Sequence, residues 1–348
     1  MYIQTLRLPE LESAWKWPRL VSPYLDEVGE ECLEWAASFG AYDPETQKLV
    51  HDKGKLNLLA AMCYARLTKE QLRSGCDLMH LFFMFDEYSD KSGPDEVWDQ
   101  ARIQMDAFCN PHKPRPQGEW IGGEFTRQFW LRIPETATET FRRRFLETWK
   151  DYVDSVAEQA ELRSKAHIPD LATYFPVRRN TSGAPSTIVF CEMDMDIPDD
   201  VREHPAIREL ETLAVDLIVI ANDLLSYNKE QAVGDDEHNI VTVIMKEFDL
   251  DVQEAFDEAG RLSDRKIDRF YHLYNNLPRW AESVNLDVHR FVNDMAQCVS
   301  GVMHWSYESQ RYFGNRGLVV KQTRLMQMLP RVIDNSNIGP VPVDDTKI

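Results

Sequence analysis

Apolar residues recur at helical spacing along most of this chain, and no run of β-branched residues shows the two-residue period of a strand. Residues 23–39 are a clear example, since Tyr24, Val28, Cys32 and Trp35 fall three or four positions apart and so share one face. Further segments of this kind cover residues 56–67, 70–85, 126–132, 138–163, 213–230 and 291–312. The sequence therefore predicts an all-α fold.

The composition gives no reason to divide the chain into domains. A length of 348 residues permits two or three, but the only Pro-rich segment, residues 110–118, is followed at once by helical patterns. A hydrophobic content of 43% suffices for a sizeable core. We predict one domain over residues 1–348, with an extended or frayed N-terminal arm at residues 1–22 and a flexible C-terminal tail at residues 330–348.

The formal net charge of −19 opposes binding to nucleic acid and to anionic membrane surfaces, because both carry negative charge. No apolar run approaches the roughly 18 residues of a membrane span, and the N-terminus lacks the apolar core of a signal peptide. The six cysteines show no C-x-x-C or Cys/His spacing, which favours buried free thiols over disulfides or a zinc site. We predict a cytoplasmic protein, monomeric or homodimeric, with no nucleic-acid partner and no membrane insertion.

Three oxygen-bearing side chains follow the apolar run at residues 213–220. Asn222, Ser226 and Glu230 stand at positions i, i+4 and i+8, which places an amide, a hydroxyl and a carboxylate on one helix face. These hard oxygen ligands are the kind that Mg²⁺ prefers. A polar helix face turned to water is the alternative interpretation.

A second acidic cluster follows the apolar stretch at residues 81–85. Asp86 and Asp90 are one helical turn apart and share a face, while Glu87 lies about 100° away. Carboxylates at the end of a buried helix are costly unless a positive group neutralises them, and the helix dipole is unfavourable to them there. The helix could simply emerge into solvent at this point. Two such helix ends, however, suggest one shared mouth that binds metal ions.

The two motifs together resemble those of class I terpene synthases. The pattern D-E-x-x-D at residues 86–90 is followed, about 130 residues later, by N-D-x-x-S-x-x-x-E at residues 222–230, and roughly 80 residues further on by an Arg-Tyr pair at residues 311–312. The chain is most similar to fungal, basidiomycete-type sesquiterpene synthases, and the resemblance extends over residues 7–312. It implies a single-domain helical bundle around an apolar active-site cavity.

The resemblance also implies a cofactor and a reaction. Three Mg²⁺ ions, for which Mn²⁺ is a possible substitute, would bind an allylic diphosphate and assist its ionisation, and the carbocation would cyclise in a closed apolar pocket as pyrophosphate is released. The side chains that would hold the metal ions are Asp86, Asp90, Asn222, Ser226 and Glu230.

A predicted helix break near Gly183 supplies further candidates. Gly183 and Pro185 would interrupt a regular helix, and the adjacent Arg178 and Arg179 could clamp a diphosphate through their planar donor forks. The resemblance implies that one arginine senses the diphosphate while the backbone of the break assists. The four-residue step to Gly183 favours Arg179, and a shifted alignment would choose Arg178. A charged turn that pairs with the acidic surface is the alternative.

The remaining candidates flank the motifs. Lys229 could reach phosphate oxygens, although a solvated lysine at a helix end would look the same. Arg311 is expected to donate through its guanidinium and Tyr312 through its hydroxyl, as the resemblance implies. Phe82, one turn before the first motif, and Trp305, one to two turns before Arg311, could stabilise a carbocation with their ring faces. Core packing is the alternative role for Trp305.

Other functions explain the motifs less well. Chain-elongating prenyltransferases and squalene-type synthases carry two Asp-rich motifs, whereas the second motif here is N-D-x-x-S-x-x-x-E. A helical lipid-binding protein would account for the apolar helices but not for the paired oxygen ligands. We therefore expect a sesquiterpene synthase that acts on farnesyl diphosphate. The expected product is a cyclic sesquiterpene, of protoilludene type through 1,11-closure, or another hydrocarbon or alcohol through 1,10-closure.

Overall fold

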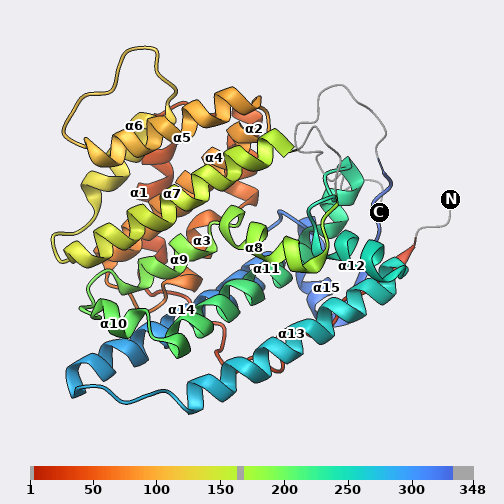
Figure 1. The fold of residues 1–348 in the computed structure, drawn as a ribbon. Helices are drawn as coiled ribbons and strands as arrows, with labels where there is room; N and C mark the ends of the chain where they lie inside the picture. The colour runs from red at the N-terminus through yellow and green to blue at the C-terminus, as the bar shows by residue number, and fades with distance from the viewer. Residues whose placement is uncertain (1–3, 163–167, 332–348) are drawn as a thin grey trace.

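A computed structural model describes residues 4–162 and 168–331, and most of these residues lie in helices (Figure 1). In the first part of the chain the elements are β1 (Thr5–Arg7), α1 (Leu25–Ser38), α2 (Pro44–Lys48), the π-helical turn η1 (Leu49–Lys53), α3 (Leu56–Cys63), α4 (Lys69–Ser89), α5 (Pro94–Cys109), α6 (Gly122–Arg132) and α7 (Glu139–Leu162). In the second part they are α8 (Leu171–Thr181), α9 (Ala184–Val189), η3 (Phe190–Glu192), α10 (Asp199–Arg202), α11 (Pro205–Val233), α12 (Ile240–Phe248), α13 (Val252–Asn275), α14 (Glu282–Glu308), η4 (Gly314–Arg316), α15 (Gly317–Thr323) and β2 (Leu325–Gln327). The helices confirm the predicted all-α class.

Local signals in the sequence set several of these helix ends. Thr68 and Gln71 form a reciprocal capping box at the start of α4, which satisfies two backbone N–H groups that the helix leaves free. Pro205 occupies the first position of α11, where its missing N–H is of no consequence. The same helix ends at Gly234, whose positive φ of 78° suits a residue without a Cβ atom. Both motif-bearing helices therefore begin at signals that the sequence carries.

Two central helices organise the bundle. Helices α11 and α14 pack against each other, with α3 on the other side of α14 and α13 on the other side of α11 (Figure 1). The second layer is built by α4, α5, α6 and α7 around a core rich in aromatic side chains. Long helices of this kind gain most of their stability from the burial of one apolar face. The arrangement brings the C-terminal halves of α4 and α11 into the same part of the molecule.

From residue 4 onwards, the N-terminal arm packs against the rest of the fold. Strand β1 pairs with β2 in antiparallel register, with Leu6 opposite Met326. Further along the arm, Trp15 Nε1 donates to the carbonyl of Ala296 at 3.1 Å, and Trp15 and Trp17 are buried against α13 and α14. This two-stranded sheet is an addition to the predicted all-α fold. Its three-residue strands are too short for alternation to be visible in the sequence.

The predicted bounds of one long helix were wrong. The helix expected over residues 291–312 begins earlier and ends at Glu308, so Arg311 and Tyr312 lie beyond it. The helix expected over residues 138–163 is α7, which is described as far as Leu162. Residue 163 and the part of the predicted tail from 332 to 348 lie outside the described residues.

Two other sequence predictions concern the described residues. The six cysteines are free, and all except Cys109 are buried, as predicted. Within the described ranges, none of the helices combines the length and the apolar character that crossing a bilayer requires.

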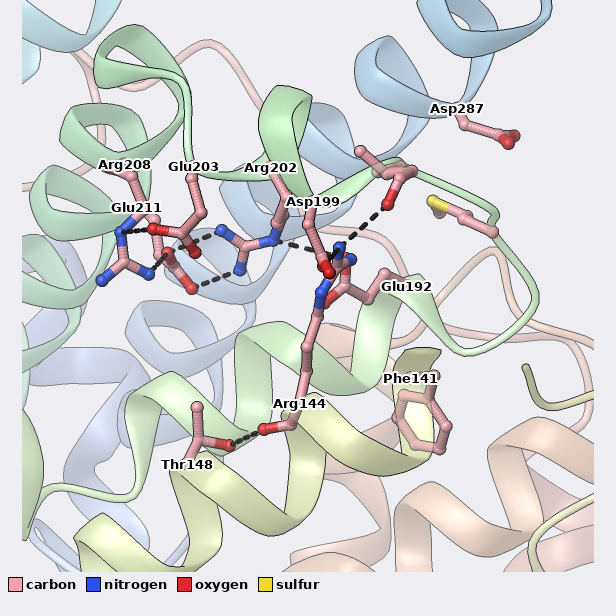
Figure 2. Close-up of polar contacts among 12 residues, drawn as sticks. Phe141, Arg144, Thr148, Glu192, Asp199, Arg202, Glu203, Arg208, Glu211 and Asp287 are labelled. Carbon is pink, nitrogen blue, oxygen red and sulfur yellow. Dashed lines mark hydrogen bonds and ion pairs between the residues drawn. The ribbon is translucent and has the colours of Figure 1, made fainter. Parts of the chain in front are cut away.

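A buried network of ion pairs fixes the connection that leads into α11 (Figure 2). Arg202 contacts Glu211 with both terminal nitrogens, at 2.9 and 2.6 Å, and Glu192 with Nε at 3.3 Å. Arg144 of α7 donates to the same Glu192 carboxylate at 2.9 Å. These charges are compensated by partners, as buried charges must be. The network therefore links α7, η3, α10 and α11 and fixes the position of η3 relative to α11.

Candidate active site

The two oxygen-bearing motifs face each other at one end of the bundle, connected by Arg311 and Tyr312. Arg311 Nη2 lies 3.7 Å from Asp86 Oδ2, and Asn222 Nδ2 donates to the Tyr312 hydroxyl at 3.0 Å. Because Arg311 and Tyr312 are adjacent in sequence, these contacts bring α4 and α11 within reach of one small molecule. The geometry agrees with a mouth shared by both motifs.

The second motif lies on the C-terminal half of α11 in a largely buried setting. Ser226 is 2% exposed, and Glu230 Oε2 accepts a hydrogen bond from Asn239 Nδ2 at 2.8 Å. Burial, and secondarily the charge of Asp223, raises the pKa of Glu230 to about 7. Asn222 uses both ends of its amide, because its Oδ1 accepts from Arg178 Nη2 at 2.9 Å. The motif is therefore held in place by groups outside it.

The first motif is more open. The side chain of Asp86 is 51% exposed and faces Arg311. Asp90 caps the end of α4, where its backbone N–H bonds to the carbonyl of Asp86 at 3.0 Å. Glu87 lies on a neighbouring face, where it pairs with Lys91 at 3.3 Å. The structure thus places Asp86 towards the second motif, and Asp90 one turn further from the body of the helix.

Asp223 binds several groups around the second motif, and the sequence analysis did not identify it. Its buried carboxylate accepts hydrogen bonds from the Tyr174 hydroxyl, from Arg178 Nε and Nη2 at 3.2 and 3.0 Å, and from the backbone N–H of Ile240 at 2.8 Å. Asp223 therefore binds α8 and the start of α12 to the second motif. A signal was available: Asp216 and Asp223 are seven residues apart on one helix face, and two adjacent arginines precede them in the chain.

Of the two candidate arginines, the structure brings Arg178 to the motif and directs Arg179 elsewhere. Arg179 Nε and Nη2 contact the buried carboxylate of Asp216 at 2.6 and 3.0 Å, and Lys266 binds the same carboxylate at 2.7 Å. The contacts of the two side chains therefore favour Arg178, whereas the four-residue step to Gly183 favours Arg179, and the choice between them stays a prediction. Adjacent helical side chains point about 100° apart, so only one of them can face Asn222.

The helix break predicted near Gly183 is present. Helix α8 ends at Thr181 and α9 begins at Ala184, while Gly183 between them has a φ of 67°. A Cβ atom at this position would lie 2.6 Å from the ring of Phe82. Glycine is required here both by the left-handed backbone and by this close approach. The break therefore presents its backbone directly to Phe82, one turn before Asp86.

Cationic groups border the space between the motifs. Arg311 lies 4.7 Å above the ring of Phe83, and its buried Nε has no hydrogen-bond partner among the described residues. The charge of Arg311, together with burial, lowers the pKa of Lys229 to about 8. Two cations so close to each other favour an anion between them. Lys229 forms no ion pair within the described part of the chain, which leaves its ammonium available.

Aromatic side chains pack next to the two motifs. Phe82 packs on Trp149 and Tyr152 with ring centroids 4.9 and 5.3 Å apart. Trp305 is buried, with its ring 5.9 Å from those of Phe83 and of Tyr312. Its indole N–H is directed to backbone carbonyls rather than to the mouth. Phe83, Trp149 and Tyr152 were not predicted, because core aromatic residues and lining aromatic residues have the same helical spacing.

The donor set fits a hard divalent cation. No three His, Cys, Asp or Glu side chains in the described ranges converge closely enough to hold an ion by themselves. Asp86, Asp90 and Glu230 would supply carboxylate oxygens to such an ion, Asn222 an amide oxygen and Ser226 a hydroxyl. Such oxygen ligands, with no thiol or imidazole among them, suit Mg²⁺ or Mn²⁺.

Comparison with known proteins assigns the family. The model of the family described as "Terpene synthase family 2, C-terminal metal binding" matches residues 77–269, which include both motifs. The chain belongs to this terpene synthase family. The family is a metal-binding one, in agreement with the oxygen-rich motifs described above.

Similar proteins extend the match over nearly the whole chain. A Delta(6)-protoilludene synthase of Stereum hirsutum is 43% identical over 97% of this chain and 92% of its own length. One from Armillaria gallica is 40% identical over 99% of both chains. Among solved structures, germacradien-4-ol synthase from Streptomyces citricolor matches with a TM-score of 0.74 at 22% identity, over 85% of this chain and 99% of that one. The last comparison supports the terpene synthase fold alone.

The shifted pKa values of the site predict a bell-shaped pH dependence of anion binding. Below about pH 7 Glu230 is protonated and is a poor metal ligand, and above about pH 8 Lys229 loses its charge. Binding of pyrophosphate in the presence of Mg²⁺ should therefore be strongest between these values. Calorimetric titration from pH 6 to pH 9 measures it. The alkaline decline should be absent in Lys229→Met, and a profile identical to that of the wild type would contradict the assignment.

Proposed function

We propose that this protein is a sesquiterpene synthase that converts farnesyl diphosphate into a cyclic sesquiterpene and pyrophosphate. The observation that carries the proposal is the convergence of Asp86 and Asn222 on the Arg311–Tyr312 pair, at 3.7 and 3.0 Å. This arrangement brings oxygen-bearing side chains next to cationic donors and aromatic rings. An allylic diphosphate has the matching parts, an anionic head and an apolar tail.

The metal ligands are assigned by position. We assign Asp86 and Asp90 to one side of the mouth and Asn222, Ser226 and Glu230 to the other. Three Mg²⁺ ions, when bound, would neutralise charge on the diphosphate as its bond to the allylic carbon breaks. The raised pKa of Glu230 supports this role, because a buried carboxylate next to Asp223 gains most from a nearby cation.

The chain's own donors act on the same leaving group. Arg311 and Arg178 offer planar forks to phosphate oxygens, Lys229 offers a point charge, and the Tyr312 hydroxyl donates a hydrogen bond. Such fixed donors stabilise the charge that develops on pyrophosphate without a cost of reorganisation. Arg178 takes the sensing role, because its Nη2 already lies 2.9 Å from the Asn222 ligand oxygen.

The apolar part of the site directs the carbocation. The rings of Phe82, Phe83 and Trp305 pack next to the two motifs. A desolvated ring face stabilises a cation by about 2 kcal/mol. The exclusion of water prevents premature quenching of the cation. The Delta(6)-protoilludene synthases that cover almost the whole chain at 36–43% identity favour the same product here, through 1,11-closure. A different cyclic sesquiterpene through 1,10-closure is the alternative outcome.

The experiment is an incubation of the purified protein with farnesyl diphosphate and Mg²⁺. We expect a cyclic C15 hydrocarbon in the headspace, Delta(6)-protoilludene by mass spectrum and retention time, and one equivalent of pyrophosphate in solution. Geranyl and geranylgeranyl diphosphate serve as chain-length controls, and EDTA should abolish the reaction. A folded preparation that releases neither product would refute the function.

A matched pair of variants separates the two arginines. Arg178→Ala should lower kcat/KM by about a hundredfold, the effect of losing one fixed donor to the leaving group. Arg179→Ala should leave kcat/KM of the folded enzyme within about threefold of the wild-type value, because the guanidinium of Arg179 binds Asp216 and not the second motif. Steady-state kinetics with both variants provide the test. The reverse order of effects would restore Arg179 as the sensing residue.

A further inference from the structure

The Arg311–Tyr312 pair is positioned from outside its own helix. Helix α14 ends at Glu308, and the chain then turns through Ser309 and Gln310 before it reaches the pair. Beyond the helix, the regular hydrogen bonds that would fix these residues are absent. Besides the side-chain contacts of Arg311 with Asp86 and of Tyr312 with Asn222, the contacts that hold residues 305–310 therefore contribute to the placement of the pair.

The turn formed by residues 53–55 holds this segment at three points. Trp305 Nε1 donates to the carbonyls of Gly54 and Lys55 at 2.8 and 3.1 Å. The backbone N–H of Gln310 donates to the carbonyl of Lys53 at 2.9 Å. Lys55 Nζ donates to the carbonyl of Glu308, the last residue of α14, at 3.0 Å. These contacts join residues about 250 positions apart in sequence and end directly before Arg311.

The local conformation of the turn is unusual. The π-helical turn η1 closes with a hydrogen bond from the N–H of Gly54 to the carbonyl of Leu49. A Cβ atom on Gly54 would lie 2.4 Å from the carbonyl oxygen of Val50, so that only glycine fits there. Lys55 follows with φ 48° and ψ 49°, a left-handed conformation that is strained for lysine and free for glycine. Glycine at position 55 would remove the strain but also the ammonium group.

We propose that Lys55 is a positioning residue for the Arg311–Tyr312 pair, and that the turn at residues 53–55 sets the geometry of the diphosphate site through it. The ammonium of Lys55 binds a free carbonyl at the negative end of the α14 dipole, where a cation is favoured. Arg19 of the N-terminal arm holds the side chain of the same Glu308 at 2.6 and 2.7 Å. The end of α14 is thus fixed from two sides. The chain that follows it therefore reaches Arg311 along a defined path.

This inference rests on the proposed function, since it concerns the binding of a diphosphate. The test measures the affinity of the full-length protein for inorganic pyrophosphate with Mg²⁺, by calorimetry, and the share of uncyclised products from farnesyl diphosphate. Lys55→Met should weaken pyrophosphate binding about two- to fivefold and raise the uncyclised share, while Lys55→Arg should restore both. Lys53→Met is the matched control, because its side chain has no polar contact among the described residues.

A further variant separates positioning from stability. Lys55→Gly relieves the left-handed strain, so that its Tm should equal or exceed that of the wild type, yet it should weaken pyrophosphate binding as much as Lys55→Met does. Unchanged binding in both Lys55 variants, or an equal loss in Lys53→Met, would overturn the inference. If the wild type itself neither binds pyrophosphate with Mg²⁺ nor turns over farnesyl diphosphate, the proposed function fails, and the inference with it.

Discussion

Replacement of Asn222 and Glu230 together by alanine is expected to lower kcat/KM for farnesyl diphosphate by at least about a thousandfold, because several kcal/mol of charge stabilisation at the leaving group are lost. Both side chains lie on one face of α11, eight residues apart. Steady-state kinetics at saturating Mg²⁺ measure the effect. Thermal unfolding without metal should change little, since burial of the Glu230 carboxylate is itself unfavourable.

An exposed carboxylate on the same helix supplies the control. Glu209 lies near the start of α11, where it pairs with Arg269 at 2.7 Å and is far from the motif. Glu209→Ala should retain wild-type kinetics. Near-normal turnover in the Asn222/Glu230 double variant would show that the metal ligands are misassigned.

The second large effect is expected at Asp223. Asp223→Ala removes the carboxylate shared by Tyr174, Arg178 and the N–H of Ile240, and leaves the guanidinium of Arg178 without its anionic partner. The loss of one member of such a buried pair costs about 3–5 kcal/mol. We therefore expect the free energy of unfolding to fall by about this amount, measured by urea denaturation. The activity that remains should also fall, because Arg178 loses its orientation.

Asp216 provides the comparison for this variant. It is buried like Asp223, two turns earlier on α11, and holds Arg179 and Lys266 instead. Asp216→Ala should destabilise the protein by a similar amount but leave kcat/KM of the folded enzyme close to normal. A loss of activity equal to that of Asp223→Ala would show that orientation of Arg178 is not the specific role of Asp223.

The sequence was sufficient to predict the parts of the site that depend on local spacing. Asn222, Ser226 and Glu230 share a face because helical geometry places every fourth residue there, and the helix around them has clear start and stop signals. The break at Gly183 was predictable for a similar reason, since glycine and proline interrupt helices by their own conformational limits. These inferences needed no knowledge of what packs against the helix.

The parts that could not be predicted depend on contacts between distant segments. No glycine or proline marks the end of α14 in the sequence. The last residue of this helix, Glu308, is instead bound by Lys55 and Arg19 from elsewhere in the chain. The direction of the Arg178 side chain could not be predicted either, since it depends on which carboxylate of α11 lies opposite Arg178 across the interface between α8 and α11. Position within a helix can be read from the sequence, but the neighbour across the interface cannot.

The most direct test of a site shared by the two motifs is a crystal structure with Mg²⁺ and pyrophosphate bound. We predict metal ions bound by Asp86 and Asp90 on one side and by Asn222, Ser226 and Glu230 on the other. Pyrophosphate should lie between them, in contact with Arg178, Lys229, Arg311 and Tyr312. Metal ions bound by one motif alone, with the other facing solvent, would contradict it.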